Sequence, residues 1–453
     1  MTALVEGFGA DACGLARFLA GEGQAVRIAA PEPETAEVLA LRGLGISVEP
    51  NADLDVEPGP AEVAYLDVWT PEVAPRVARL RAQGTRVTCL GDLLLERWQG
   101  PTIGITGTAG KTTTTSLVAS ILRGDGRAVA LSAGARAGNL WPTSDLLDLL
   151  PSVSATRATL ILELTSSHLA LMRHSPTVAA IVSFWPDHLE LHGGLARYRA
   201  AKATIVRHQG DGGTFVVNAD DASAGFAAEA SGCMIEFSLH RPVTHGAYLD
   251  SGSNIVVVEP SGPESRVGRL DGAVAHPGNI VAAAAIACAA GATRSGIAAG
   301  VASTAPLPYR ARQIGTLRGV PVIDDGMAAT PTKTAALLAG YPDRSIVLIA
   351  GGTDDAGGGP VHATPEESAL LDRACDEIAR AARSVVLFGA GGSRLGPLLT
   401  ERGVEIRTVE DLAAAVKVAG SQAAGATAIV FSPLFPLPAE ERAGFEALVA
   451  RCG

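Results

Sequence analysis

Short runs of apolar and β-branched residues alternate with stretches rich in alanine, leucine and arginine along the whole 453-residue sequence. The short runs predict strands, and the stretches between them have the length and composition of helices. A strand, a helix and a further strand in this order form the βαβ unit of a parallel sheet. We therefore expect an α/β protein with open, mainly parallel sheets.

The alternation falls into three blocks, which we predict to be domains of residues 1–98, 99–303 and 304–453. In the first block, strands at 3–5 and 26–29 flank a glycine turn, Gly7–Gly14, and a helix through 15–19. A glycine turn that opens a helix suits a bound phosphate. The third glycine of the dinucleotide-binding pattern falls at Ala12, so a nucleotide site and a tight structural turn both remain open.

The second block begins after Pro101, and the third begins near two closely spaced prolines, Pro306 and Pro308. In the second block we expect strands at 102–105, 159–162, 179–182 and 215–217, a helix at 111–122, a small β excursion within 238–274 and an alanine-rich helix at 280–290. In the third block we expect strands at 320–323, 346–349, 385–388 and 428–431, with helices between them.

Composition narrows the class of protein. Apolar residues make up 47% and charged residues 18%, which indicates a folded chain, and the net charge of −11 argues against a general nucleic-acid-binding surface. No stretch reaches the roughly 20 apolar residues of a membrane span, and the start of the sequence resembles no signal peptide. The six cysteines show no zinc-binding spacing, which fits a reducing compartment. We expect a cytoplasmic, monomeric protein that binds neither nucleic acid nor membrane.

The segment Thr106-Gly-Thr-Ala-Gly-Lys-Thr112 carries the strongest local signal. Its glycines let backbone N–H groups approach phosphate oxygens, Lys111 supplies a positive charge, and the Thr112 hydroxyl can reach a metal ion. Ile105 occupies the first glycine position of the usual phosphate-loop pattern. The strand, glycine-rich turn and helix nevertheless predict a phosphate site, against the alternative of a chance Gly/Thr turn.

Acidic and imidazole side chains follow two further strands of the second block. Glu163 ends one strand, and His188 lies in Pro186-Asp-His-Leu-Glu-Leu-His192 after the next. The carboxyl ends of parallel strands are where open α/β sheets bind ligands. Glu163 is thus a candidate Mg²⁺ ligand, unless it only caps the next helix. A lone His188 would more often be structural, but its position 14 residues before Lys202 favours a role in the site.

These motifs together resemble the Mur ligases. The resemblance rests on Gly104-Ile-Thr-Gly-Thr-x-Gly-Lys-Thr112, Glu163-Leu-x-Ser166, Pro186-Asp-His-Leu189, Tyr198-Arg-Ala-Ala-Lys202, Asn218-Ala-Asp-Asp221 and Ser432-Pro433. It covers nearly the whole chain and is greatest for the branch that adds glutamate to UDP-N-acetylmuramoyl-L-alanine. It implies three domains: a Rossmann-like N-terminal domain for the UDP-sugar, a central P-loop ATPase domain with a parallel sheet, and a Rossmann-like C-terminal domain for the amino acid.

The resemblance also implies roles for individual residues. An ATP-dependent, ADP-forming carboxylate–amine ligase of this family works through an acyl phosphate, with two Mg²⁺ ions and a carbamylated lysine, here Lys202. Catalytic roles are implied for Lys111, Glu163, His188 and Lys202. Metal contacts are implied for Thr112, Glu163, His188 and Lys202. ATP contacts are implied for Gly107, Thr108, Gly110, Lys111, Thr112, Thr113, Asn279, Arg310 and Asp325. Substrate contacts are implied for Gly9, Asn139, Ser166, His168 and Ser432.

The departures from the family pattern cluster in the amino-acid pocket. Two lysines that contact D-glutamate in the family are replaced here by Met327 and Asp355. The ATP-binding motif is retained except at Ala109, where the family has an asparagine. In the adenine-contacting motif, Ala282 stands in place of a second asparagine. Each lost charge-assisted hydrogen bond is worth about 1.5–3 kcal/mol, so these changes alter amino-acid binding.

A variant of the family that adds L-glutamate to the same acceptor also lacks these lysines and has an Asp-Asp pair followed by Thr-Pro, as Asp324-Asp325 and Thr330-Pro331 do here. Lys333, Arg312 or Arg394 could then receive the side-chain carboxylate. We expect peptidoglycan precursor synthesis with L-glutamate favoured over D-glutamate. The alternative is a specialised ligase of secondary metabolism that joins a different carboxylate and amine. The segment after the second strand, where an acid is expected for uridine, reads Ala-Ala-Pro-Glu at residues 29–32, so uridine recognition stays open.

Overall fold

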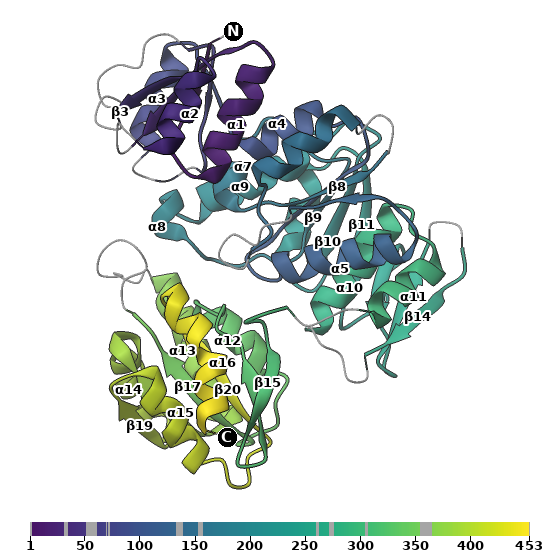
Figure 1. Ribbon diagram of the computed structural model, residues 1–453. Coiled ribbons are helices and arrows are strands. Elements are labelled where there is room, and N and C mark those ends of the chain that lie inside the picture. Colours follow the sequence, from purple (N-terminus) through teal and green to yellow (C-terminus); the bar gives the residue numbers. More distant parts are fainter. Residues whose placement is uncertain are drawn as a thin grey trace. The chain divides into compact units, whose positions relative to one another are not determined.

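The computed structural model describes residues 2–30, 35–50, 61–68, 70, 73–132, 139–152, 157–259, 262–270, 276–303, 307–353 and 365–452. The chain divides into two compact units, one of Met1–Asp271 with Pro277–Thr304 and one of Gly272–His276 with Ala305–Gly453 (Figure 1). The predicted domain boundaries at residues 98 and 303 remain predictions. In the described part of the chain, no helix is both long and apolar enough to cross a membrane.

The first unit begins with a five-stranded parallel sheet in the order β3-β2-β1-β4-β5. Its strands are β1 (Thr2–Val5), β2 (Ala25–Ala30), β3 (Ser47–Pro50), β4 (Val63–Tyr65) and β5 (Arg86–Thr88). Its helices are α1 (Ala10–Gly21), α2 (Ala36–Gly43), α3 (Ala74–Ala82) and α4 (Leu90–Arg97). The strand order changes direction between β1 and β4, and such a switch point is where open α/β sheets bind ligands.

The rest of the first unit is built on a nine-stranded sheet in the order β14-β13-β12-β11-β10-β9-β6-β8-β7. Its strands are β6 (Thr102–Thr106), β7 (Val129–Ala130), β8 (Thr159–Glu163), β9 (Val178–Ile181), β10 (Thr214–Asn218), β11 (Cys233–Ser238), β12 (Gly246–Leu249), β13 (Asn254–Val258) and β14 (Ser265–Arg269). Only the pairs β12/β13 and β13/β14 are antiparallel among the described strands. The parallel strands β6 and β8 are buried along their whole length, as strands covered on both faces are.

Helices join and cover these strands (Figure 1). They are α5 (Lys111–Gly124), α7 (Ser166–Leu169), α8 (Leu189–His192), α9 (Leu195–Arg207), α10 (Pro277–Ala289) and α11 (Arg294–Ala302), with 3-10 helices η2 (Ser144–Ser152) and η3 (Ala222–Glu229). Helix α10 is apolar on all sides, and every residue from Ile280 to Ala287 is buried. A helix without a polar face is stable only inside a protein, which explains its alanine-rich sequence.

The second unit contains a six-stranded sheet in the order β15-β16-β20-β17-β18-β19, in which only β15/β16 is antiparallel among the described strands. The strands are β15 (Arg312–Leu317), β16 (Val320–Asp324), β17 (Ile346–Gly351), β18 (Ala382–Phe388), β19 (Ile406–Val409) and β20 (Ala428–Leu434). The helices are α12 (Pro331–Leu338), α13 (Pro365–Ala381), α14 (Gly389–Glu401), α15 (Leu412–Ser421) and α16 (Ala439–Cys452).

The predicted α/β class is confirmed, and each predicted strand falls on an observed one. The β excursion is the β12–β14 meander, and the alanine-rich helix is α10. The edge strands β15 and β19 were not expected, because their half-exposed residues lack the continuous apolar run of the central strands.

Candidate active site

A tight turn between β6 and α5 forms the predicted phosphate loop. Gly110 precedes α5 with a φ of 81°, a left-handed conformation that favours glycine. The turn is tied to the end of β9: the Thr108 N–H donates to the Ser183 carbonyl at 3.0 Å and the Ala109 N–H to the Ser183 hydroxyl at 2.9 Å. The amides at the start of α5 and the helix dipole therefore suit an anion, and a phosphate bound here stays a prediction.

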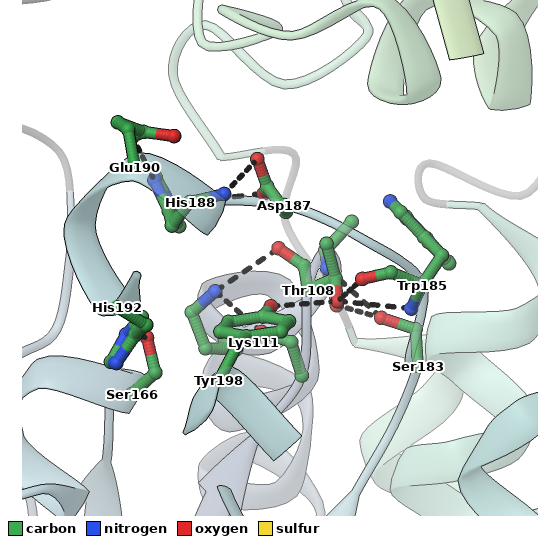
Figure 2. Close-up of polar contacts among 12 residues, drawn as sticks. Thr108, Lys111, Ser166, Ser183, Trp185, Asp187, His188, Glu190, His192 and Tyr198 are labelled. Atoms are coloured by element: carbon green, nitrogen blue, oxygen red, sulfur yellow. Dashed lines mark hydrogen bonds and ion pairs between the residues drawn. The ribbon is translucent and has the colours of Figure 1, made fainter. Parts of the chain in front are cut away.

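Lys111 points back over this turn (Figure 2). Its Nζ donates to the Gly107 carbonyl at 2.8 Å and lies 3.3 Å from the Thr108 carbonyl. These carbonyls hold the ammonium at the loop, where it can pair with a phosphate by a modest rotation of a flexible side chain.

Thr112 and Glu163 meet below the loop. The Thr112 hydroxyl donates to Glu163 Oε1 at 2.9 Å and lies 3.2 Å from Asn139 Oδ1, while the Leu140 N–H donates to Glu163 Oε2 at 2.7 Å. The Glu163 side chain is fully buried. The helix that follows β8 is capped by Thr165, so the alternative that Glu163 only caps that helix is wrong. A hydroxyl, a carboxylate and an amide oxygen are hard donors of the kind that Mg²⁺ prefers.

Lys202 lies inside the molecule on α9. Its side chain is 1% exposed, its Nζ is 3.4 Å from Thr106 Oγ1, and it lies 4.9 Å from the centre of the Tyr198 ring. Burial, with the positive charge of Lys111 nearby, lowers the pKa of Lys202 well below its ordinary value. Burial therefore favours the neutral amine form of this lysine, which lies close to the phosphate loop.

His188 stands at the start of α8 with a φ of 52°. Its ring nitrogens lie 3.7 Å from Asp187 and 3.9 Å from Glu190, and about half of its side chain is exposed (Figure 2). The structure thus places this histidine among carboxylates of its own segment. Its contact with a metal stays a prediction.

Asn279 reaches the phosphate loop from the first turn of α10. A Cβ atom on Gly110 would lie only 2.4 Å from Asn279 Oδ1. The sequence separates these residues by more than 160 positions, and the fold brings them together as expected for a shared ATP site. Thr113, the next residue of α5 after Thr112, is half-buried.

The predicted substrate residues of the first unit contact other residues of the protein. Ser166 forms a hydrogen bond with the buried His192, whose Nε2 lies 2.9 Å from the Ser166 hydroxyl. His168 forms a capping box with Thr165, and its ring meets Trp141 edge-on at 5.7 Å. Gly9 caps α1 and lines a cavity in the N-terminal part of the unit. Their substrate contacts stay predictions.

The second unit holds the other predicted residues. The Ser432 hydroxyl donates to Asp325 Oδ2 at 3.1 Å and lies 2.7 Å from the Thr334 hydroxyl. Desolvation raises the pKa of Asp325 to about 7, and burial raises that of Asp324 to about 6. Arg310 lies between Tyr309 and Ala311, two residues with positive φ. Among the departures from the family pattern, Met327 donates its N–H to the Tyr309 carbonyl, and Asp355 lies outside the described residues.

Three residues of the site were not identified from the sequence in the contacts that they make here. Tyr198 lies 2.9 Å from Thr108 Oγ1 through its hydroxyl, Ser183 binds the loop, and His192 lies against the Tyr198 ring (Figure 2). Burial, with His188 and Lys202 nearby, lowers the pKa of His192 to about 4, so it is neutral at pH 7. In the described part of the chain, no three His, Cys, Asp or Glu side chains form a group that could hold a metal ion.

Comparison with known proteins agrees with this geometry. Residues 105–287 match the family described as Mur ligase middle domain. A UDP-N-acetylmuramoylalanine--D-glutamate ligase of Frankia casuarinae is 31% identical over 444 residues, covering 95% of this chain and 88% of that protein. One of Symbiobacterium thermophilum is 30% identical over 452 residues, covering 95% and 92%.

Solved structures show the same fold at lower identity. MurF of Acinetobacter baumannii has a TM-score of 0.60 at 18% identity, covering 98% of this chain and 90% of that one. The UDP-N-acetylmuramate-alanine ligase MurC of Thermotoga maritima has a TM-score of 0.59 at 18% identity, covering 100% and 99%. From the phosphate loop, the buried Thr112–Glu163 pair and the identity along nearly its whole length, the chain belongs to the Mur ligase family of ATP-dependent, ADP-forming amide ligases.

Proposed function

We propose that the chain joins glutamate, preferentially the L-enantiomer, to UDP-N-acetylmuramoyl-L-alanine through an acyl phosphate. The Thr112–Glu163 contact beside the phosphate loop carries this proposal, because it supports the phosphoryl-transfer half of the reaction in this chain. The names of the relatives support the acceptor and glutamate, and they specify the D-enantiomer.

In the first step, an oxygen of the acceptor carboxylate attacks the γ-phosphorus of ATP, the bond to the bridging oxygen breaks, and ADP leaves. The α5 amides and Lys111 offset negative charge that builds up on the phosphoryl oxygens. In the second step, the glutamate amine attacks the acyl carbon, inorganic phosphate leaves, and the amine loses a proton as the amide forms.

Thr112 and Glu163 would hold a Mg²⁺ ion, which when bound offsets charge on the phosphates. Two oxygen ligands at hydrogen-bond distance fit this ion, and the backbone N–H of Leu140 keeps the Glu163 carboxylate in place. Hydrogen bonds of this kind, made to a metal ligand rather than to the metal, orient the ligands of metal sites.

The surroundings of Lys202 support a carbamate on its amine. A neutral amine adds CO₂ and releases one proton, giving an anionic carbamate, whereas an ammonium cannot react. Burial lowers the pKa of Lys202 and so favours its neutral amine, and the nearby Thr106 hydroxyl can donate to a carbamate oxygen. The modification would turn a lysine into an oxygen ligand for a second Mg²⁺ ion, with His188 as its expected partner.

The preference for L-glutamate rests on the second unit. The resemblance implies a D-glutamate lysine at the position of Met327, which is half-buried next to Tyr309. An uncharged thioether cannot replace an ammonium that pairs with a carboxylate. Of the basic residues considered as substitutes, Arg312 forms an ion pair with Glu446 and Arg394 lies over the Phe435 ring. Lys333, Arg312 and Arg394 stay the residues proposed to receive the side-chain carboxylate.

The test is phosphate release by the full chain with Mg²⁺, ATP, UDP-N-acetylmuramoyl-L-alanine and either glutamate enantiomer. We expect release to require all components and to be faster with L-glutamate. Faster release with D-glutamate would overturn the proposed preference for L-glutamate. Turnover of an unrelated acid without turnover of the UDP-sugar would overturn the proposed acceptor.

A specialised ligase for another acceptor is the second candidate. The cavity at the carboxyl ends of β1 and β4, where the UDP-sugar is expected, is lined by three carboxylates, Glu6, Asp11 and Asp67. Of residues 29–32, where an acid is expected for uridine, Pro31 and Glu32 lie outside the described residues. The same assay with a panel of carboxylic acids distinguishes the two candidates.

A further inference from the structure

The cavity of the N-terminal sheet is small, with a volume of about 60 Å³, and it opens to solvent. Residues that follow β1 and β4 line it, so it lies at the switch point of the sheet, where ligands of open α/β sheets bind. Gly7 and Gly9 bring the N-terminus of α1 to its edge. Position and helix dipole therefore suit a phosphate.

The charges in the cavity oppose that ligand. Its described lining residues include the carboxylates Glu6, Asp11 and Asp67 and no lysine, arginine or histidine. The diphosphate of a UDP-linked acceptor carries about two negative charges, and like charges in a half-buried cleft repel each other by more than they do in water. A basic residue from outside the lining is needed to hold it.

Arg76 on α3 is in the position to supply this charge. Its guanidinium forms an ion pair with Glu6, the cavity residue that directly follows β1. The side chains of the two residues are 17% and 10% exposed, so the pair is largely shielded from solvent. A guanidinium can hold a carboxylate or a phosphate with the same planar donors.

We propose that Arg76 binds the diphosphate of the acceptor and that Glu6 occupies the guanidinium when no nucleotide is bound. The proposal rests on the UDP-linked acceptor of the proposed function and adds the residue that recognises the diphosphate of that acceptor. A ligand must then displace Glu6, and a group with one weak negative charge does so less well than a diphosphate. Glu6 thus acts as a filter against acceptors without the nucleotide.

The experiment measures binding of UDP to the full chain by calorimetry, with ATP binding as the control for an intact fold. Removal of Arg76 (R76A) should weaken UDP binding by about tenfold to a hundredfold, the range for a lost charge-assisted contact. Removal of Arg79 (R79A), an exposed arginine one turn further along α3, should leave the affinity for UDP within about twofold of the wild type. Neutralisation of Glu6 (E6Q) should strengthen it by severalfold.

The opposite signs of R76A and E6Q separate ligand binding from a structural role. If the ion pair only stabilises the fold, both variants weaken UDP binding together, and the proposal is overturned. Equal UDP affinity of R76A and R79A also overturns it, while the proposed function stands. A wild-type chain that binds ATP and not UDP overturns both. Should R76A not fold, E6Q still decides, because unchanged or weaker UDP binding by E6Q contradicts the exchange.

Discussion

At the scale of single residues, the most informative side chain is the buried Lys202. We predict that Lys202→Ala lowers ligase activity by roughly a hundredfold or more, because the phosphate site would lose the proposed carbamate, an anionic oxygen ligand. Formate or acetate should partly restore the activity by entering the space that the side chain leaves. Lys417→Ala, at an exposed lysine of the second unit, is the matched control. ADP formation is the measurement, and activity near the wild-type level in the Lys202 variant would contradict the metal-bridging role.

A second residue-scale prediction concerns Gly110. Its positive φ and the contact with Asn279 make any side chain costly, so Gly110→Ala should destabilise the chain by about 1–3 kcal/mol and weaken ATP binding. Gly126 has a similar φ of 76°, and nothing lies within 4 Å of its missing Cβ. Gly126→Ala should therefore show only the backbone cost, about 1 kcal/mol, with unchanged ATP binding. Denaturant unfolding and nucleotide titration of both variants check this, and equal ATP affinity would show that the Asn279 contact does not matter.

At the scale of elements, Asp92 joins α4 to the segment before β9. Its buried carboxylate accepts hydrogen bonds from Thr88 at 2.6 Å and from the backbone N–H groups of Arg173 and His174 at 2.8 and 2.9 Å. Asp92→Ala leaves buried donors without partners, and we expect a loss of about 2–4 kcal/mol of unfolding free energy. Asp376→Ala, which removes an exposed ion pair with Arg402, should cost under about 1 kcal/mol. A similar midpoint shift in both variants would contradict the role of Asp92.

The elements also show what the sequence can predict and what it cannot. Lys111, Thr112 and Glu163 were identifiable because strands, a glycine turn and a helix place them at fixed local offsets. Tyr198, 90 residues from Thr108, reaches it only through the packing of α9, which no local pattern encodes. The ion pair between Glu6 and Arg76 could not be predicted for the same reason, since Arg76 lies on a different element 70 residues away.

At the scale of the whole molecule, the two units should respond to acid in opposite directions. In the first unit the pKa of His192 is lowered from 6.5 to about 4, so between these values the unfolded chain binds more protons and stability falls as the pH falls. In the second unit the pKa values of Asp324 and Asp325 are raised from 3.8 to about 6 and about 7. There the folded state binds more protons, so stability rises as the pH falls from about 7 towards 4.

Each pKa unit corresponds to about 1.4 kcal/mol, so the effects reach a few kcal/mol and a few degrees in melting temperature. Calorimetry of the full chain at pH 7.5 and pH 5 should show one unfolding transition moving down and another moving up. Asp325→Asn removes the carboxyl group with the more strongly raised pKa. In that variant the upward shift of one melting temperature should be smaller, while the downward shift of the other stays. Two transitions that move down together would contradict the buried, protonatable pair in the second unit. Because these carboxyl groups and His192 lie in different compact units, the test also shows whether the units unfold separately.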